Sequence, residues 1–207
     1  MPYDSITFHC IGGGLAHLKI MLSAGETSGD LHGAVLAREL RALDPAVSLI
    51  GFGGAEMAAA GVVLRQNYTD YNVMGISAVL LNLRRIFALL DDLTRLMEEE
   101  RPDVLVIIDY PDFNWRLAAR AKERGIPVFS YIPPSAWAWR KGRAKSCARV
   151  ADEIVAIFPH ELPPYEAAGA NISFVGNPLI DTVHAEMEAE EARLHFGIAD
   201  GDVPVLL

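Results

Sequence analysis

The sequence predicts an α/β protein with a mostly parallel sheet that helices cover on both faces. Two observations lead to this fold class. Short apolar runs rich in β-branched residues alternate along the chain with longer amphipathic segments, which is the pattern of parallel strands joined by helices. The runs are apolar enough to be buried on both sides of a sheet. With 207 residues and 51% hydrophobic content, the chain can also bury the large core that such a fold needs.

The predicted strands are the apolar runs, and an amphipathic segment follows each of them. Strands are expected at residues 18–24, 47–52, 103–109, 126–132, 152–158 and 171–176. Helices are expected near residues 30–43, 74–100, 113–124, 137–150, 161–168 and 178–196. Because every crossover is helical, the strands run in one direction and their carboxyl ends share one edge of the sheet.

Residues 18–200 are predicted to form one domain between two short segments. Residues 1–17 have neither the basic start nor the long apolar stretch of a signal peptide, so we expect a poorly ordered extension. Residues 201–207 follow a polar turn and are expected to begin a second domain, because "VPVLL" has the character of a strand. No apolar run reaches the ~20 residues that span a bilayer, which predicts a soluble protein that can still bind a membrane surface.

Charge and cysteine content narrow the classes of partner. The 18 basic and 27 acidic residues give a formal net charge of −9, which argues against nucleic-acid binding because that depends on clustered Lys and Arg. Cys10 and Cys147 fit no metal or redox spacing and suit structural thiols in a reducing compartment.

Polar and aromatic residues gather where the predicted strands end. The segments concerned are "SAGETSGD" (23–30), "DYPDFN" (109–114), "PPSAWAWRKGR" (133–143), "FPHE" (158–161) and "GNPLID" (176–181). Because ligands of open parallel sheets bind beyond the carboxyl ends of the strands, the sequence predicts a functional cleft at this edge. The alternative is a set of ordinary solvent-exposed loops.

The first of these turns favours a sugar or another polyol. Gly25 and Gly29 permit a tight turn, and Ser28 or Asp30 can cap the following helix. The turn lacks the ending of a phosphate-binding loop and the spacing of a dinucleotide fingerprint. Glu26 and Asp30 would repel a phosphate, whereas carboxylates accept hydrogen bonds from hydroxyl groups. A plain capping turn is the alternative.

Asp109 is the candidate general base. It ends a fully apolar strand, where burial raises the pKa of a carboxyl toward the working pH that suits proton transfer. The alternative is a structural carboxylate that accepts hydrogen bonds from nearby backbone N–H groups. Asp112 is predicted to be the N-cap of the next helix, with Asn114 in its first turn.

Two further segments leave alternatives open. The dense basic cluster Arg140, Lys141, Arg143 and Lys145 is either a solvated helix face or a docking site for a substrate phosphate or an anionic membrane. The helix over 71–93 is either buried or in contact with a membrane interface or acyl chains. Its predicted core stripe consists of Ile76, Val79, Leu80, Leu83, Ile86, Phe87 and Leu90. Met74, Leu81 and Leu89 are expected on the opposite side, beside Arg84 and Arg85.

Several motifs in register resemble the N-terminal half of the lipid-A-disaccharide synthase family. They are "SAGETSGD", "VMGISAVL" followed by "LRR", "PDVLVIIDYPDFN", "PSAWAWR" and "VGNPLIDTV". The resemblance runs from about Leu18 to the chain end. It implies a Rossmann-like doubly wound parallel sheet, the N-terminal half of a two-domain inverting glycosyltransferase of the GT-B type, with no metal and no cofactor. The C-terminal half would then carry most contacts to UDP.

The resemblance also implies substrates, a location and partners. Such an enzyme transfers 2,3-diacylglucosamine from UDP-2,3-diacylglucosamine to the 6-hydroxyl of 2,3-diacylglucosamine 1-phosphate. The product is a β-1,6-linked disaccharide of lipid A biosynthesis. Family members are peripheral to the cytoplasmic face of the inner membrane, an anionic surface, and form homodimers.

Site residues are implied position by position. Asp109 aligns with the essential aspartate of the family. The residues expected to bind substrate are Gly25, Glu26, Thr27, Ser28, Asp30, Asn114, Ser135, Trp139, Arg140 and Asn177. Those expected to meet membrane or acyl chains are Val73, Met74, Ile76, Val79, Leu80, Leu81, Arg84 and Arg85. Asn177 stands where many members have histidine, so no catalytic role is assigned to it.

Two other functions remain open from the sequence. One is another GT-B enzyme that acts on a UDP-sugar, such as a UDP-N-acetylglucosamine epimerase. It would have no need for the apolar segment at 73–83. The other is a non-catalytic module that binds the acceptor or a membrane.

Overall fold

The computed structural model describes residues 17–71, 78–134, 142–199 and 201–203. Its contacts divide the chain into two compact units, one ending at Gly176 and one running from Asn177 to Leu207. We describe each unit by itself. The predicted extension falls almost entirely outside the described residues.

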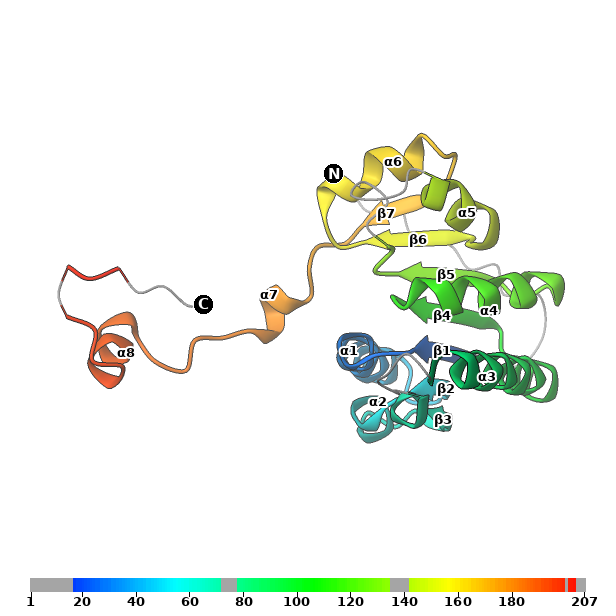
Figure 1. Ribbon diagram of the computed structural model, residues 1–207, viewed down its shortest axis with the longest axis horizontal. Helices are drawn as coiled ribbons and strands as arrows, with labels where there is room; N and C mark the ends of the chain where they lie inside the picture. The colour runs from blue at the N-terminus through cyan, green and yellow to red at the C-terminus, as the bar shows by residue number, and fades with distance from the viewer. Residues whose placement is uncertain (1–16, 72–77, 135–141, 200, 204–207) are drawn as a thin grey trace. The chain divides into compact units, whose positions relative to one another are not determined.

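The first unit is built on one parallel sheet with the strand order β3-β2-β1-β4-β5-β6-β7 (Figure 1). The strands are β1 (Lys19–Ala24), β2 (Ser48–Gly53), β3 (Val63–Asn67), β4 (Val104–Ile108), β5 (Val128–Tyr131), β6 (Glu153–Ala156) and β7 (Ile172–Phe174). All pairs are parallel. The mostly parallel sheet is therefore confirmed, and its strand order reverses between β1 and β4.

Helices flank this sheet on both faces (Figure 1). They are α1 (Thr27–Leu43), α2 (Ala55–Ala59), α3 (Ala78–Glu100), α4 (Pro111–Glu123), α5 (Gly142–Val150) and α6 (Leu162–Glu166). Two 3-10 helices, η1 (Tyr68–Tyr71) and η2 (Pro159–Glu161), complete this unit. The sequence analysis missed β3 and α2. The β3 segment is half exposed and carries Arg65 and Gln66, so it lacks the apolar run that marked the other strands.

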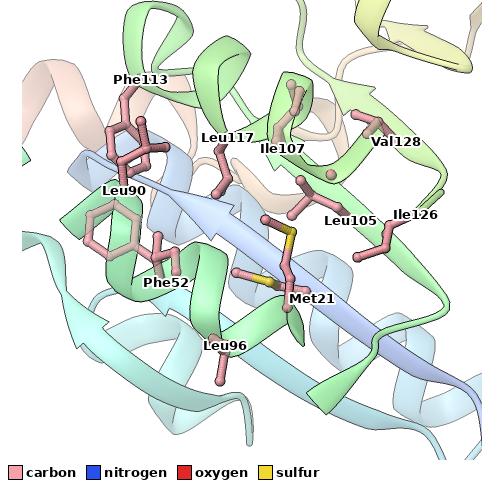
Figure 2. Packing of buried hydrophobic residues seen from close by; sticks show 14 of the residues in the cluster. Met21, Phe52, Leu90, Leu96, Leu105, Ile107, Phe113, Leu117, Ile126 and Val128 are labelled. Atoms are coloured by element: carbon pink, nitrogen blue, oxygen red, sulfur yellow. The ribbon is translucent and has the colours of Figure 1, made fainter. Parts of the chain in front are cut away.

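Neighbouring residues of the central strands pack into separate cores. Met21 joins the cluster formed with α3 and α4, which Figure 2 shows together with Leu90, Leu105 and Leu117. Ile20 and Leu22 join the cluster formed with α1 and α2. Because successive side chains of a strand point to opposite faces, this partition is the physical basis of the doubly wound fold.

The predicted core stripe of the helix over 71–93 is wrong in part. Leu83 and Phe87 are 45% and 46% exposed, whereas Leu89 is 3% exposed. Leu89 shares its face with Leu93 and Leu96, which follow it at the i+4 and i+7 positions. These residues lie at or beyond the end of the stretch from which the stripe was predicted. In the described part of α3, residues 83–100, the buried face is therefore set by the residues from Leu89 onward.

The second unit contains α7 (Leu179–Thr182) and α8 (Ala189–His195). The single helix predicted over 178–196 is wrong, because Val183 and Glu188 adopt extended backbone conformations. Glu186 and Glu190 would stand at i and i+4 of a continuous helix and repel each other. The described side chains of α8 are not buried, so packing does not offset that cost. The second domain expected at 201–207 stays a prediction.

Substituting leucines on α3 tests its burial. We expect Leu89→Ala to lower the free energy of unfolding by about 2–5 kcal/mol, because it leaves a cavity in the core. Leu83→Ala on the same helix should cost less than about 1 kcal/mol, since that side chain is already half exposed. Urea unfolding followed by circular dichroism measures both. If Leu83→Ala lowered the free energy of unfolding more than Leu89→Ala does, the predicted core stripe would be right.

Candidate active site

The candidate site lies at the carboxyl ends of β1 and β4, where the strand order reverses. Ala24 and Ile108 are paired at the ends of these two strands. The Gly25–Glu26 turn and the Asp109–Tyr110 turn therefore begin side by side. Chains leaving adjacent strands toward opposite faces open a crevice at such a switch point. The structure thus places two of the predicted polar turns together.

Asp109 and Tyr110 both adopt left-handed backbone conformations, with φ of 46° and 48°. Such conformations cost non-glycine residues roughly 1–2 kcal/mol each. Tyr110 occupies the N-cap position of α4, so the prediction of Asp112 as N-cap is wrong. Asp112 lies in the first turn of α4, and its exposed carboxylate is 3.7 Å from Arg143 Nη2. The left-handed pair turns the chain into α4 two residues earlier than a capping Asp112 would.

Gly25 permits the close approach of the two turns. A Cβ atom at this position would lie 2.1 Å from Cδ1 of Tyr110. No side chain can therefore replace the hydrogen of Gly25 unless the Tyr110 ring moves. The glycine acts here by leaving space for a ring, as well as by permitting a tight turn.

The Asp109 carboxyl has the electrostatic environment of a proton acceptor. Burial raises its pKa to about 6, with further contributions from the negative charge of Glu26 and from a hydrogen bond with the Glu26 side chain. A hydrogen bond from the Tyr110 backbone acts in the opposite direction. Two carboxyl groups from two strand ends thus interact directly. A carboxyl with a pKa near 6 is ionised at neutral pH and still accepts a proton readily.

The other residues of the first turn serve its geometry. Glu26 stands at the N-cap of α1 without capping it. Ser28 Oγ donates to Glu26 Oε1 at 2.9 Å, so it orients that carboxylate and does not cap the helix as predicted. Thr27 Oγ1 lies 3.2 Å from the hydroxyl of Tyr68 in η1.

Asp30 has a structural role in this arrangement. It is 2% exposed, and its carboxylate accepts N–H groups of Gly54 at 2.8 Å, Glu56 at 3.1 Å and Met57 at 3.1 Å. Asp30 therefore caps α2 and not its own helix, contrary to the predicted cap. Its oxygens are occupied by the backbone, which favours this role over the substrate binding expected from the motif.

Asn114 links the two turns from the interior of the protein. Its side chain is fully buried and bonds to Ser23 of β1 and to the carbonyl groups at the end of β4. Sequence reasoning missed Ser23 and Tyr110. A hydroxyl inside the apolar run "LKIMLSA" was the available signal for Ser23, because a buried polar group requires a partner. Tyr110 left no comparable signal.

The structure does not bring every predicted residue to this site. Ser135, Trp139 and Arg140 lie outside the described residues, as do Val73, Met74 and Ile76. Val79, Leu80 and Leu81 belong to α3, but their side chains are likewise not described. Arg84 and Arg85 are exposed on α3, and Asn177 belongs to the second unit.

The described parts of the chain contain neither a metal-binding cluster nor a membrane-spanning helix. Over those residues, no three His, Cys, Asp or Glu side chains are grouped so that they could hold a metal ion. Among the described helices, none combines the length and the apolar character needed to cross a bilayer.

Comparison with known proteins gives a family. The model described as lipid-A-disaccharide synthetase matches residues 20–206. A lipid-A-disaccharide synthase of Geobacter metallireducens is 45% identical over 180 residues, which are 87% of this chain and 47% of that protein. One of Myxococcus xanthus is 40% identical over 188 residues, or 91% and 49% of the two chains. The chain spans about half the length of the curated relatives it matches.

Solved structures with the same fold are more distant in sequence. MurG of Acinetobacter baumannii has a TM-score of 0.53 at 13% identity, over 84% of this chain and 47% of its own. A UDP-GlcNAc 2-epimerase of Neisseria meningitidis, bound to UDP-GlcNAc, has a TM-score of 0.60 at 13% identity, over 79% and 47%. The predicted fold class, the Rossmann-like N-terminal half of a GT-B protein, is confirmed by the sheet and these neighbours. Because the family model covers nearly all of the sequence, the chain belongs to the lipid-A-disaccharide synthase family.

Proposed function

We propose that this chain forms the acceptor-side half of a lipid-A-disaccharide synthase. The reaction transfers 2,3-diacylglucosamine from UDP-2,3-diacylglucosamine to the 6-hydroxyl of 2,3-diacylglucosamine 1-phosphate and makes a β-1,6 linkage. The observation that carries the proposal is the half-buried Asp109 carboxyl beside Glu26 at the switch point of the sheet. Curated relatives up to 45% identical bear this name. The cytoplasmic face of the inner membrane and the homodimer implied by the resemblance belong to the same proposal.

Asp109 acts as general base in the proposed mechanism. Its carboxylate takes the proton of the acceptor 6-hydroxyl while that oxygen attacks C1 of the donor sugar. The bond between C1 and the UDP oxygen breaks on the opposite face, and UDP leaves with the electron pair, so the configuration at C1 is inverted. Burial and, after it, the negative charge of Glu26 keep the pKa of Asp109 high enough for this transfer. Glu26 also offers carboxylate oxygens to sugar hydroxyls.

Replacing the base should abolish most turnover. In the full-length protein we expect Asp109→Asn to lower kcat by about 10²- to 10⁴-fold, because an amide cannot accept the proton. Asp112→Asn is the matched control, since it alters an exposed carboxylate of the same turn. Disaccharide formation is measured with purified variants of equal Tm. Near-normal turnover of Asp109→Asn would overturn the assignment of the base.

Glu26 should control the pH at which activity is lost. The negative charge of Glu26 raises the pKa of Asp109, so its removal in Glu26→Gln should lower that pKa. Because the base must be ionised, the acid limb of the kcat/KM profile should move to lower pH. Glu39→Gln, on the exposed side of α1, should leave the limb in place. If the acid limb stays in place or moves to higher pH in Glu26→Gln, Glu26 does not raise the pKa of Asp109.

We include in the proposal a membrane-facing surface on α3, defined by Leu83, Arg84, Arg85 and Phe87. All four side chains are exposed, and the Arg116 guanidinium carbon lies 5.8 Å from the centre of the Phe87 ring. Apolar side chains flanked by arginines suit the boundary between acyl chains and anionic headgroups. This surface adjoins the segment in which acyl-chain contacts are expected.

Charge reversal on this surface should weaken vesicle binding. Each arginine near an anionic surface contributes about 1 kcal/mol, so Arg84→Glu with Arg85→Glu should reduce affinity for phosphatidylglycerol vesicles by more than about tenfold. Binding to neutral phosphatidylcholine vesicles should be weak in all variants. Arg38→Glu with Arg41→Glu, two exposed arginines on α1, changes the net charge by the same amount and serves as the control. Equal losses in the two double variants, measured by co-sedimentation, would show that the α3 surface has no special role.

A further inference from the structure

The backbone that carries the candidate base is held by one buried amide. Asn114, in the first turn of α4, is 0% exposed. Its Nδ2 donates to the carbonyl oxygens of Asp109 at 2.8 Å, Ser23 at 3.2 Å and Ile108 at 3.3 Å. Its Oδ1 accepts from Ser23 Oγ at 2.7 Å. The amide therefore has every donor and its acceptor engaged within the protein.

These partners determine which side chain the position requires. Three carbonyl oxygens surround Nδ2, so only donors satisfy them, whereas the Ser23 hydroxyl needs an acceptor. Asparagine supplies two N–H donors and an acceptor in one plane. A carboxylate would face the carbonyl oxygens with a lone pair, and a smaller side chain would leave them unpaired in the interior.

The amide also joins the two parts of the site. Ser23 precedes the Gly25–Glu26 turn on β1, and Asp109 begins the turn after β4. Asp109 and Tyr110 both adopt left-handed conformations that non-glycine residues avoid. The shortest contact of the amide goes to the carbonyl of Asp109 itself. Asn114 thus ties the strained residue to β1, the strand that leads into the Gly25–Glu26 turn.

We propose that Asn114, together with Ser23, is a positioning device that holds Asp109 in its left-handed conformation with its carboxyl beside Glu26. Asn114 acts through Asp109 and does not itself contact substrate, because its amide is buried and fully hydrogen-bonded. The inference rests on the proposed function, in which Asp109 is the base. It departs from the substrate-binding role that the motif implied for Asn114.

Ser23→Ala is the mildest test, because it removes only the hydroxyl that orients the amide. Displacing a reacting group by about 1 Å can cost on the order of 100-fold in rate, so we expect kcat of the full-length protein to fall roughly tenfold in Ser23→Ala and roughly 100-fold in Asn114→Asp. KM for the acceptor should change by less than about threefold, since neither residue binds substrate. The acid limb of kcat should also shift, because the Asp109 carboxyl moves relative to Glu26.

Ser130→Ala is the matched control. Ser130 is a buried serine one residue from the end of β5, as Ser23 is one residue from the end of β1. Its hydroxyl contacts Cys147 at 3.9 Å and lies outside the candidate site. We expect Ser130→Ala to change Tm about as much as Ser23→Ala, with kcat and the pH profile unaltered.

The outcomes separate this inference from the proposed function. If Asp109→Asn is inactive while Ser23→Ala keeps the kcat and pH profile of Ser130→Ala, the positioning role is overturned and the base stands. If Asp109→Asn is active, the proposed base is overturned first. A rise in KM with unchanged kcat in Ser23→Ala would assign the pair to substrate binding and also refute positioning. If Asn114→Asp fails to fold, the Ser23→Ala comparison decides alone.

Discussion

The parallel pairing of β1 with β4 is the constraint on which the rest of the molecule depends. These strands are adjacent in the sheet but 80 residues apart in the chain, and from them the order of strands proceeds in opposite directions. The helices after them therefore pack on opposite faces, α1 with one core and α4 with the other. The two departing turns therefore begin side by side at the carboxyl ends of the strands, which is where ligands of such sheets bind. The left-handed pair Asp109–Tyr110 and the raised pKa of Asp109 both lie where this pairing ends.

Hydrogen bonding at that point offsets a local conformational cost. Two consecutive non-glycine residues in the left-handed region are unfavourable by themselves. Three features hold them in place. The Asn114 amide donates to the Asp109 carbonyl, the Asp109 N–H donates to the Tyr131 carbonyl at 3.3 Å, and the first turn of α4 follows directly. The same conformation leaves Asp109 partly buried beside a second carboxylate, which raises its pKa. The backbone strain at Asp109 and its raised pKa thus both follow from the conformation of the chain directly after β4.

Two regions of the chain expose apolar side chains for different structural reasons. Among the described side chains of α3 (residues 83–100), those that join the core begin at Ile86, so Leu83 remains open to solvent although it lies along the same face as Leu90. In the second unit, Ile180 and Val183 are exposed because α7 is a single short turn of helix. The α3 surface combines apolar side chains with arginines, and this combination is the basis of the membrane contact that we propose. In the second unit, Arg193 lies in sequence beside the exposed Leu194 and Phe196, but its guanidinium donates to the carbonyl groups of Ala199 and Asp202.

The sequence by itself determined the fold class, most strands and helices, the family and the position of Asp109 at a strand end. Each of these depends on local periodicity or on motifs in register, which a linear reading detects. The tertiary structure decided which face of α3 is buried and that Asp30 caps α2. It also decided the hydrogen bonds by which Ser23 and Asn114 link the two turns, and the contact between Glu26 and Asp109. Each of those depends on a partner distant in sequence. A helical pattern shows which residues share a face, but the neighbouring elements decide which face is covered, because burial is a property of the packed chain.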